Sequence, residues 1–358
     1  MVSSRVLTAV VGAGLAASLV ACGSSPSKTA SGDSTSVDVG STTVEVPTKL
    51  KKVVFFAPGS SNTYMTDMIA SMEDKAKELG IDLEVFDAGY DPTKQLNQIQ
   101  SAIARKNFDA ALVMPADGTV VCKAVSEQMP DADILVGVLM LPVCDLINKV
   151  DVPEADALWQ EGTLDFVGDS TNLSYFTALF DEAVKRNPGP QKVMIINGPA
   201  VTPNVVLMHK ALDSWKGAHP DFEFEVVEGD FTSPTAYDLT QNYLKAHPDT
   251  TLVFNVGGYD ATLGAAKAIE EAGLTGKVVL ADLGAADVVR PLIKDGELQF
   301  SSGVYPKSTG ALGLEQLVAA AAGDPVERYV DPSVLGTYDA PYMVDQSNLD
   351  EYVAESGA

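Results

Sequence analysis

The sequence is poor in the residues on which many functional classes depend. Its 358 residues include only three cysteines and three histidines, and 24 lysines and arginines stand against 49 aspartates and glutamates. Three cysteines are too few for a disulfide-rich scaffold. The net charge of −25 repels phosphate backbones, so we expect no nucleic-acid partner and no docking on anionic lipid through a basic patch. A hydrophobic content of 46% nevertheless indicates a folded chain.

Motifs for catalysis and cofactor binding are also missing. No glycine-rich dinucleotide loop follows a predicted strand, and the sequence has no Walker loop, His-Glu-x-x-His motif or nucleophile elbow. His209, His219 and His247 lie on or at the ends of predicted helices, where we interpret them as solvated surface residues. The sequence therefore predicts a protein that is not an enzyme and that holds neither cofactor nor metal.

The N-terminus has the pattern of an export signal. Arg5 is the only charged residue before Cys22, and the apolar run Val6–Val20 is shorter than the ~20 residues of a membrane-spanning helix. Its end, Leu19-Val20-Ala21-Cys22-Gly23, resembles the lipobox of bacterial lipoproteins, in which the cysteine carries a diacylglycerol. We predict a signal peptide over residues 1–21, lipidation of Cys22 and a location on the outer face of the cytoplasmic membrane. The alternative is a plain secretory signal with a chance cysteine.

The segment that follows has the composition of a linker. Residues 23–48 are rich in serine, threonine and glycine, with few large apolar groups. Such a segment cannot bury enough surface to offset its ordering entropy. We therefore predict a disordered tether over residues 22–49.

Two cysteines remain in the body of the chain, Cys122 and Cys144. Outside the cytoplasm a lone pair of thiols usually oxidises together, so we predict a Cys122–Cys144 disulfide. Two buried free thiols are the alternative. No histidine lies near either cysteine in the sequence, which disfavours a metal site.

The body alternates strand-like and helix-like segments. Residues 52–57 form an apolar run typical of a strand covered on both faces. A turn follows, then helical periodicity up to Leu79, and Gly80 stands where a C-cap belongs. The same alternation continues to a helix over 308–322. It predicts an α/β protein with parallel sheets, and the number of strands favours two doubly wound lobes with a ligand cleft at the carboxyl ends of their strands.

Several segments in order carry a family resemblance. Residues 54–64 end in Asn62-Thr63-Tyr64, residues 87–99 read DAGYDPTKQLNQI, and Met114-Pro115-Ala116-Asp117 and Asp230-Phe231 follow. Residues 52 to about 345 thereby resemble the periplasmic sugar-binding proteins of the ribose-binding type (periplasmic binding protein type 1). The resemblance implies two lobes joined by three crossing segments, over residues 50–165 with 305–335 and residues 166–304 with 336–358.

The resemblance also implies a function. We expect a monomer that closes its lobes on a small neutral solute, such as a sugar or polyol, and delivers it to an ABC permease in the cytoplasmic membrane. The alternative is a receptor that presents its ligand to a membrane signalling kinase. The carried-over ligand-binding residues are Asn62, Tyr64, Asp117, Phe231 and Asp282.

The sequence departs from the family at several positions of the site. A strand-end aspartate of the family falls near Leu139-Met140, and a glutamine falls at Val304. Neighbouring polar residues could replace these groups, and we include Tyr259, Asp260 and Tyr305 as candidates. Otherwise the ligand is less polar than an aldopyranose.

Overall fold

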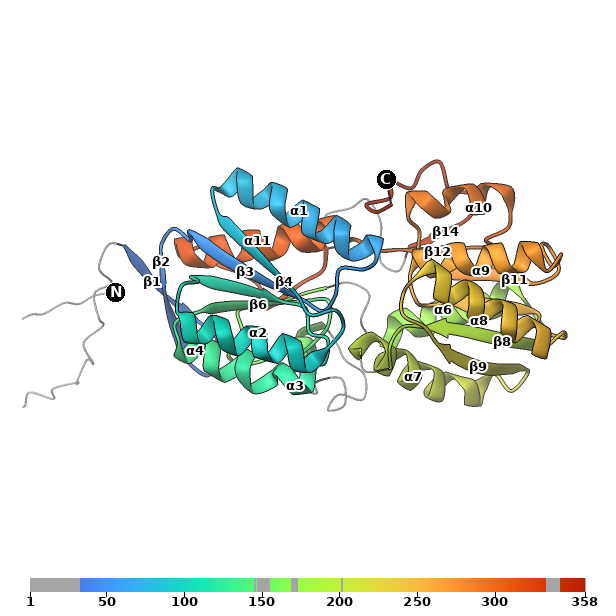
Figure 1. Ribbon diagram of the computed structural model, residues 1–358, viewed down its shortest axis with the longest axis horizontal. Coiled ribbons are helices and arrows are strands. Elements are labelled where there is room, and N and C mark those ends of the chain that lie inside the picture. The colour runs from blue at the N-terminus through green and yellow to red at the C-terminus, as the bar shows by residue number, and fades with distance from the viewer. Residues whose placement is uncertain are drawn as a thin grey trace, which may run out of the picture.

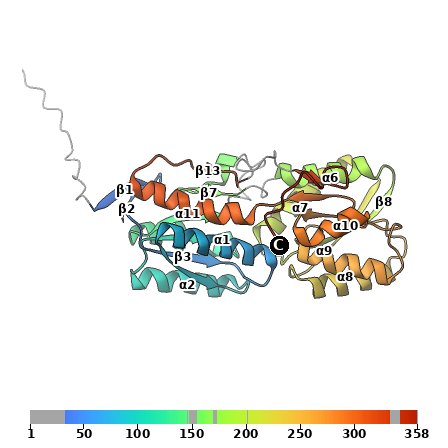
Figure 2. The ribbon, with the colours of Figure 1, turned by 90° about the horizontal axis from the view of Figure 1, so that it is seen from above.

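The protein folds into two α/β lobes that lie end to end (Figure 1). The computed structural model describes residues 33–144, 146, 155–168, 173–200, 202–332 and 342–357. Each lobe is built on one six-stranded sheet, with helices on both faces (Figures 1 and 2). The predicted two-lobe, doubly wound fold is confirmed.

The first lobe contains a wholly parallel sheet with the strand order β13-β7-β6-β5-β3-β4. The strands are β3 (Lys52–Ala57), β4 (Asp82–Asp87), β5 (Ala110–Val113), β6 (Leu135–Leu139), β7 (Phe166–Val167) and β13 (Tyr329–Val330). The helices are α1 (Thr63–Leu79), α2 (Pro92–Arg105), α3 (Gly118–Lys123), η1 (Ala124–Gln128), α4 (Met129–Asp131), η2 (Ala155–Leu158) and α11 (Pro306–Ala322).

The second lobe contains a sheet with the strand order β14-β12-β11-β10-β8-β9, in which only the β12–β14 pair is antiparallel. The strands are β8 (Gln191–Asn197), β9 (Phe222–Glu228), β10 (Leu252–Asn255), β11 (Val279–Gly284), β12 (Ser301–Gly303) and β14 (Met343–Val344). The helices are α6 (Leu173–Arg186), α7 (Pro203–Trp215), η3 (Lys216–Ala218), α8 (Ser233–Ala246), α9 (Tyr259–Glu271), η4 (Asp287–Val289) and α10 (Arg290–Asp295).

The apolar core of each lobe lies on both faces of its sheet. In the first lobe, α1 and α11 pack on one face around Phe55 and Met68, and α2 and α3 pack on the other around Phe56 and Ile99. In the second lobe, α6 and α7 cover the face that carries Phe254, and α8 and α9 cover the opposite face. Burial on both faces explains why the central strands read as continuous apolar runs.

Local sequence signals hold the first loop at the carboxyl end of its strand. Every residue of β3 after Lys52 is buried. Asn62 is the N-cap of α1, and its Oδ1 accepts a hydrogen bond from the Met65 N–H at 2.9 Å. Gly80 ends the same helix with φ at 70°, a left-handed conformation that glycine adopts without strain. The residues between β3 and α1 are therefore held by a buried strand on one side and by the capped start of a helix on the other.

The chain passes between the lobes three times: from β7 to α6, from β12 to α11 and from β13 to β14. The second passage is the pair Val304–Tyr305, and residues 169–172 and 333–341 of the other two lie outside the described part. The strand β7, Phe166–Val167, belongs to the first sheet. The opening segment of the first lobe therefore continues to Val167, beyond its predicted end at residue 165.

The predicted tether is wrong over residues 33–49. These residues form an antiparallel hairpin of β1 (Ser34–Asp38) and β2 (Thr43–Pro47). The sequence alternates valines with polar residues there, so one face of the hairpin is apolar. Val39, Val44 and Val46 are fully buried against the core of the first lobe. This regular alternation outweighs the serine-rich and threonine-rich composition on which the prediction rested.

The predicted signal peptide, the lipidation site Cys22 and residues 23–32 lie outside the described residues. Over the ranges that the structure describes, no helix is long and apolar enough to cross a membrane. The hairpin lies at the end of the first lobe that is remote from the second lobe (Figures 1 and 2).

Candidate functional site

A cleft of about 120 Å³ lies between the lobes, at the carboxyl ends of both sheets. Loops and first helical turns that follow β3, β4, β5 and β6 supply one wall. The other wall comes from α6, from the carboxyl end of β11 and from the segments that follow β8, β9, β10 and β12. This edge is where parallel α/β sheets bind ligands. The lining residues are Pro58, Asn62, Tyr64, Met65, Tyr90, Met114, Met140, Leu141, Tyr175, Phe176, Thr202, Asn204, Phe231, Val256, Gly257, Gly258, Tyr259, Asp260, Leu283, Gly284 and Val304.

Tyr90 and Asn62 are joined in the wall of the first lobe. The Asn62 amide donates from Nδ2 to the Tyr90 hydroxyl at 2.7 Å. Tyr90 follows β4 with φ at 60°, and its ring lies so close to Gly59 that a Cβ there would come within 2.4 Å of it. Burial raises the pKa of Tyr90 to about 12, so its hydroxyl stays neutral. Our sequence reasoning missed Tyr90, although the turn Gly89-Tyr90-Asp91 directly follows a strand.

Phe231 faces Tyr90 from the second lobe. The two ring centroids are 5.6 Å apart, with the rings tilted by 43°. Phe231 also has a positive φ, 65°, and a Cβ on Gly198 would come within 1.9 Å of its ring. A glycine in each lobe thus leaves room for one ring of this pair. The contact brings the two walls of the cleft together.

Asp260 also connects the lobes. It lies in the first turn of α9, and its carboxylate accepts hydrogen bonds from the Thr63 N–H at 2.7 Å and from the Thr63 hydroxyl at 2.9 Å. Thr63 is the first residue of α1 in the other lobe. Both carboxylate oxygens therefore hold the lobes together rather than pointing to an unfilled position.

Asp282 does not line the cleft, contrary to its predicted role. It is fully buried, and burial raises its pKa to about 6. Its carboxylate accepts a hydrogen bond from Thr262 Oγ1, which in turn accepts one from the Asn255 amide at 2.6 Å. The same amide donates to the Gly258 carbonyl at 2.7 Å. Asp282 therefore supports the glycine loop that forms the cleft floor, one layer beneath the surface.

Asp117 and Tyr305 also lie outside the lining. Asp117 is the N-cap of α3 and accepts hydrogen bonds from the Thr119 and Val120 N–H groups at 2.8 and 3.1 Å. Tyr305 is buried in the second passage between the lobes, and its neighbour Val304 lines the cleft in its place. The other predicted residues line the cleft: Asn62, Tyr64, Phe231, Tyr259 and Asp260.

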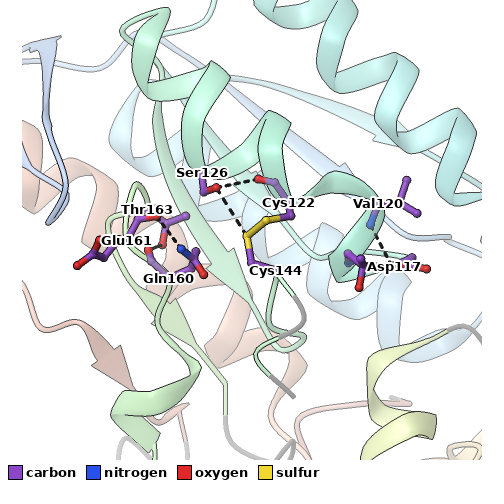
Figure 3. Close-up of a disulfide and its surroundings, with 9 residues drawn as sticks. Asp117, Val120, Cys122, Ser126, Cys144, Gln160, Glu161 and Thr163 are labelled. Carbon is purple, nitrogen blue, oxygen red and sulfur yellow. Dashed lines mark hydrogen bonds between the residues drawn. A yellow bond between two sulfur atoms is a disulfide. The ribbon is translucent and has the colours of Figure 1, made fainter. Parts of the chain in front are cut away.

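The predicted disulfide between Cys122 and Cys144 is present. It joins α3 to the loop after β6, and Figure 3 shows Ser126 beside it. Ser126 Oγ donates to the Cys122 carbonyl at 2.9 Å and lies 3.6 Å from the Cys144 sulfur. The anchored loop begins with Met140, whose φ is 57°. The disulfide therefore holds a segment of which two residues, Met140 and Leu141, line the cleft.

The C-terminal segment forms a further connection between the lobes, and it lies between them in both views (Figures 1 and 2). Ser356 bonds the Tyr259 hydroxyl of the second lobe and donates to Asp67 Oδ2 of α1 at 2.5 Å. The Gly357 N–H donates to the same oxygen at 2.8 Å. Glu355 accepts hydrogen bonds from the N–H and hydroxyl of Ser308 in α11. We call residues 355–357 the C-terminal strap.

Comparison with known proteins finds relatives along most of the chain. A family model described as a periplasmic binding protein domain matches residues 53–325. The ribose import binding protein of Salmonella typhimurium is 24% identical over 269 residues, 75% of this chain and 83% of that protein. A putative rhizopine-binding protein of Rhizobium meliloti is 29% identical over 293 residues, 78% of this chain and 85% of that protein.

Solved structures share the fold. An ABC transporter solute binding protein of Bacillus halodurans with bound myo-inositol matches with a TM-score of 0.71 and 21% identity, over 85% of this chain and 98% of that one. The matched range of the family model begins at residue 53, so the N-terminal hairpin precedes it. The cleft, in contrast, is built entirely from residues within this range.

Proposed function

Because the chain belongs to the periplasmic binding protein domain family, we propose that it captures a small neutral solute outside the cytoplasm and delivers it to an ABC importer. The resemblance to sugar-binding proteins of the ribose-binding type is confirmed, and with it the prediction of a binding protein rather than an enzyme. The observation that carries the proposal is a cleft that both lobes line and that direct contacts between the lobes, Tyr90 with Phe231 and Asp260 with Thr63, close.

The lining supports a neutral ligand. No lysine, arginine or histidine is among the described residues of the cleft, and its one acid, Asp260, is engaged by Thr63. An anion would find no charge-assisted partner there. Aromatic side chains such as Tyr90 and Phe231 suit the apolar C–H faces of a sugar or cyclic polyol. Relatives named for ribose and rhizopine, and a structure with bound myo-inositol, agree with this class.

We propose further that the protein works as a monomer held at the membrane through a lipid on Cys22. The lipobox-like sequence before Cys22 supports this anchor. The anchor would keep the receptor beside its permease, so that released solute is recaptured locally. Mass spectrometry of the membrane fraction tests this part: a diacylglyceryl group on an N-terminal Cys22 is expected, and a Cys22→Ala protein should be found in the medium.

Calorimetry and X-ray scattering test the central proposal. Purified protein should bind at least one member of a panel of sugars and polyols, and ligand-free protein should show a larger radius of gyration than protein saturated with that ligand. A strain that lacks the protein should lose uptake of the ligand. Normal uptake together with a lost transcriptional response would instead favour the signalling receptor.

A further inference from the structure

The polar side chains of the cleft are mostly committed to the protein itself. Asn62 uses Oδ1 to cap α1 and Nδ2 to hold Tyr90. Asp260 uses both oxygens on Thr63, and the Thr202 hydroxyl donates to the Pro199 carbonyl at 2.7 Å. These groups fix the walls, and each already makes a hydrogen bond within the protein before a ligand binds.

The glycine loop on the floor of the cleft is similarly engaged. The Gly257 N–H donates to Asn255 Oδ1 at 2.9 Å, and the Gly258 carbonyl accepts from Asn255 Nδ2 at 2.7 Å. The Asn255 amide also donates to Thr262 Oγ1, and the Thr262 hydroxyl in turn donates to Asp282. In binding sites, backbone groups of this kind often serve the ligand, and here the network occupies the Gly257 N–H and the Gly258 carbonyl.

One amide stands apart from this pattern. Asn204 lines the cleft in the first turn of α7, and no described residue makes a hydrogen bond to its side chain. It offers one carbonyl oxygen and one NH₂ group. The remaining lining is dominated by methionines, aliphatic side chains and aromatic rings, including Met114, Met140 and Leu141. Among the amide and carboxylate side chains of the lining, Asn204 is thus the one that no described residue engages.

The size of the cavity limits the ligand to about one ring. An engineered apolar cavity of about 150 Å³ holds benzene, and this cleft measures about 120 Å³. When a ligand hydroxyl is buried without a hydrogen-bond partner, the affinity falls by about tenfold or more. An aldopyranose carries hydroxyls around its whole rim, so several of them would face apolar walls.

Resting on the proposed function, we propose that the cleft selects a compact neutral ring solute whose polar groups lie on one side, where Asn204 binds them. The rest of the ligand is apolar, as in a deoxygenated cyclic polyol. The departures from the ribose-type pattern at Leu139-Met140 and at Val304 place the apolar side chains of Met140 and Val304 in the lining. The site thus keeps the fold of a sugar receptor with a different pattern of recognition.

Calorimetry with four probes tests this inference: D-galactose, myo-inositol, D-fucose and trans-cyclohexane-1,2-diol. The diol should bind at least about tenfold more tightly than D-galactose or myo-inositol, with D-fucose between them. Equal or tighter binding of D-galactose or myo-inositol would overturn the inference and leave the proposed function standing. Binding of none of the four probes would count against both.

Two variants locate the selectivity. Asn204→Leu should weaken diol binding by about tenfold or more, whereas the matched control Asn242→Leu, on the exposed side of α8, should leave it unchanged. Met140→Asn adds an amide at a position with φ at 57°, which asparagine tolerates. It should shift the ratio of diol to galactose affinity toward galactose by about fivefold or more. An unchanged ratio in Met140→Asn, or unchanged diol binding in a folded Asn204→Leu protein, would contradict the assignment.

Discussion

Asp260 and Thr63 hold the two lobes together through a paired hydrogen bond, in which the N–H and the hydroxyl of Thr63 donate to the two oxygens of one carboxylate. The donors belong to the first turn of a helix in one lobe, and the acceptor belongs to the first turn of a helix in the other. The pair borders the cleft, so the arrangement of the lobes and the shape of the ligand site depend on the same contact.

Removing the Thr63 hydroxyl should weaken ligand binding, although Thr63 is not among the residues that line the cleft. Thr63→Val keeps the backbone donor and loses the bond from Oγ1, which costs about 1–2 kcal/mol. The closed form is then less populated, and affinity should fall by about tenfold. Thr63→Ser keeps the hydroxyl and serves as the control. Calorimetry should find Thr63→Ser within about twofold of the natural protein; a Thr63→Val protein with full affinity would show that closure does not need this bond.

Phe231 is expected to contribute through its ring face. Phe231→Ala removes one of the two rings that meet across the cleft, and a lost aromatic contact with its buried area costs about 1.5–3 kcal/mol. Affinity should drop by at least tenfold while the melting temperature changes little. Phe231→Tyr keeps the ring and should bind nearly normally. If the alanine variant binds as well as the natural protein, then Phe231 covers the cleft without contacting the ligand.

The C-terminal strap should favour the closed arrangement. Ser356→Ala removes the side-chain bonds to Asp67 and Tyr259, and we expect affinity to fall by about fivefold and the radius of gyration at half-saturation to rise. Ser347→Ala, on an exposed turn that precedes the strap, is the control. If Ser356→Ala changes neither the scattering nor the affinity, then the strap stabilises the second lobe and has no effect on closure.

Asp165 should make stability depend on pH. It lies directly before β7 and is buried, neither carboxylate oxygen has a hydrogen-bond partner among the described residues, and burial raises its pKa from 3.8 to about 8 although nearby Arg328 lowers it. Between about pH 4 and pH 8 the folded protein keeps this proton and the unfolded chain has released it, so stability falls as pH rises through this window.

The variant Asp165→Asn removes that titration. Its melting temperature should be near that of the natural protein at pH 4 and should exceed it by at least about 4 °C at pH 8. Asp324→Asn, at an exposed position after α11, is the matched control and should not alter the profile. A constant difference between the natural protein and Asp165→Asn across this range would contradict a buried protonated carboxyl.

Much of the architecture could be read from the sequence because its signals are local. The run at 52–57, the cap at Asn62 and the terminating Gly80 each act within a few residues. The hairpin was missed for a related reason: four valines at alternating positions are a weak signal inside a segment whose composition suggests a linker. Its stability comes from burial against the first lobe, which no local pattern contains.

The candidate site could be predicted only in outline. Strand ends locate the cleft, yet they do not tell which side chain of a pair points into it, and Val304 lines it where we expected Tyr305. Asp282 follows the strand pattern of a ligand-binding residue but turns toward Thr262 beneath the floor. Tyr90 lines the cleft from a backbone position with a positive φ. Such a conformation is unusual for tyrosine and cannot be predicted from the residue type.

The hairpin has a consequence for how the molecule would stand on a membrane. Since β1 begins at Ser34, the chain between an anchored Cys22 and the folded body could reach no more than about 40 Å even when fully stretched. The attachment point lies at the pole farthest from the second lobe (Figure 1). If the proposed lipid anchor is present, an upright molecule would carry its ligand well away from the bilayer, and both lobes would approach a membrane-embedded partner only with the body lying along the surface.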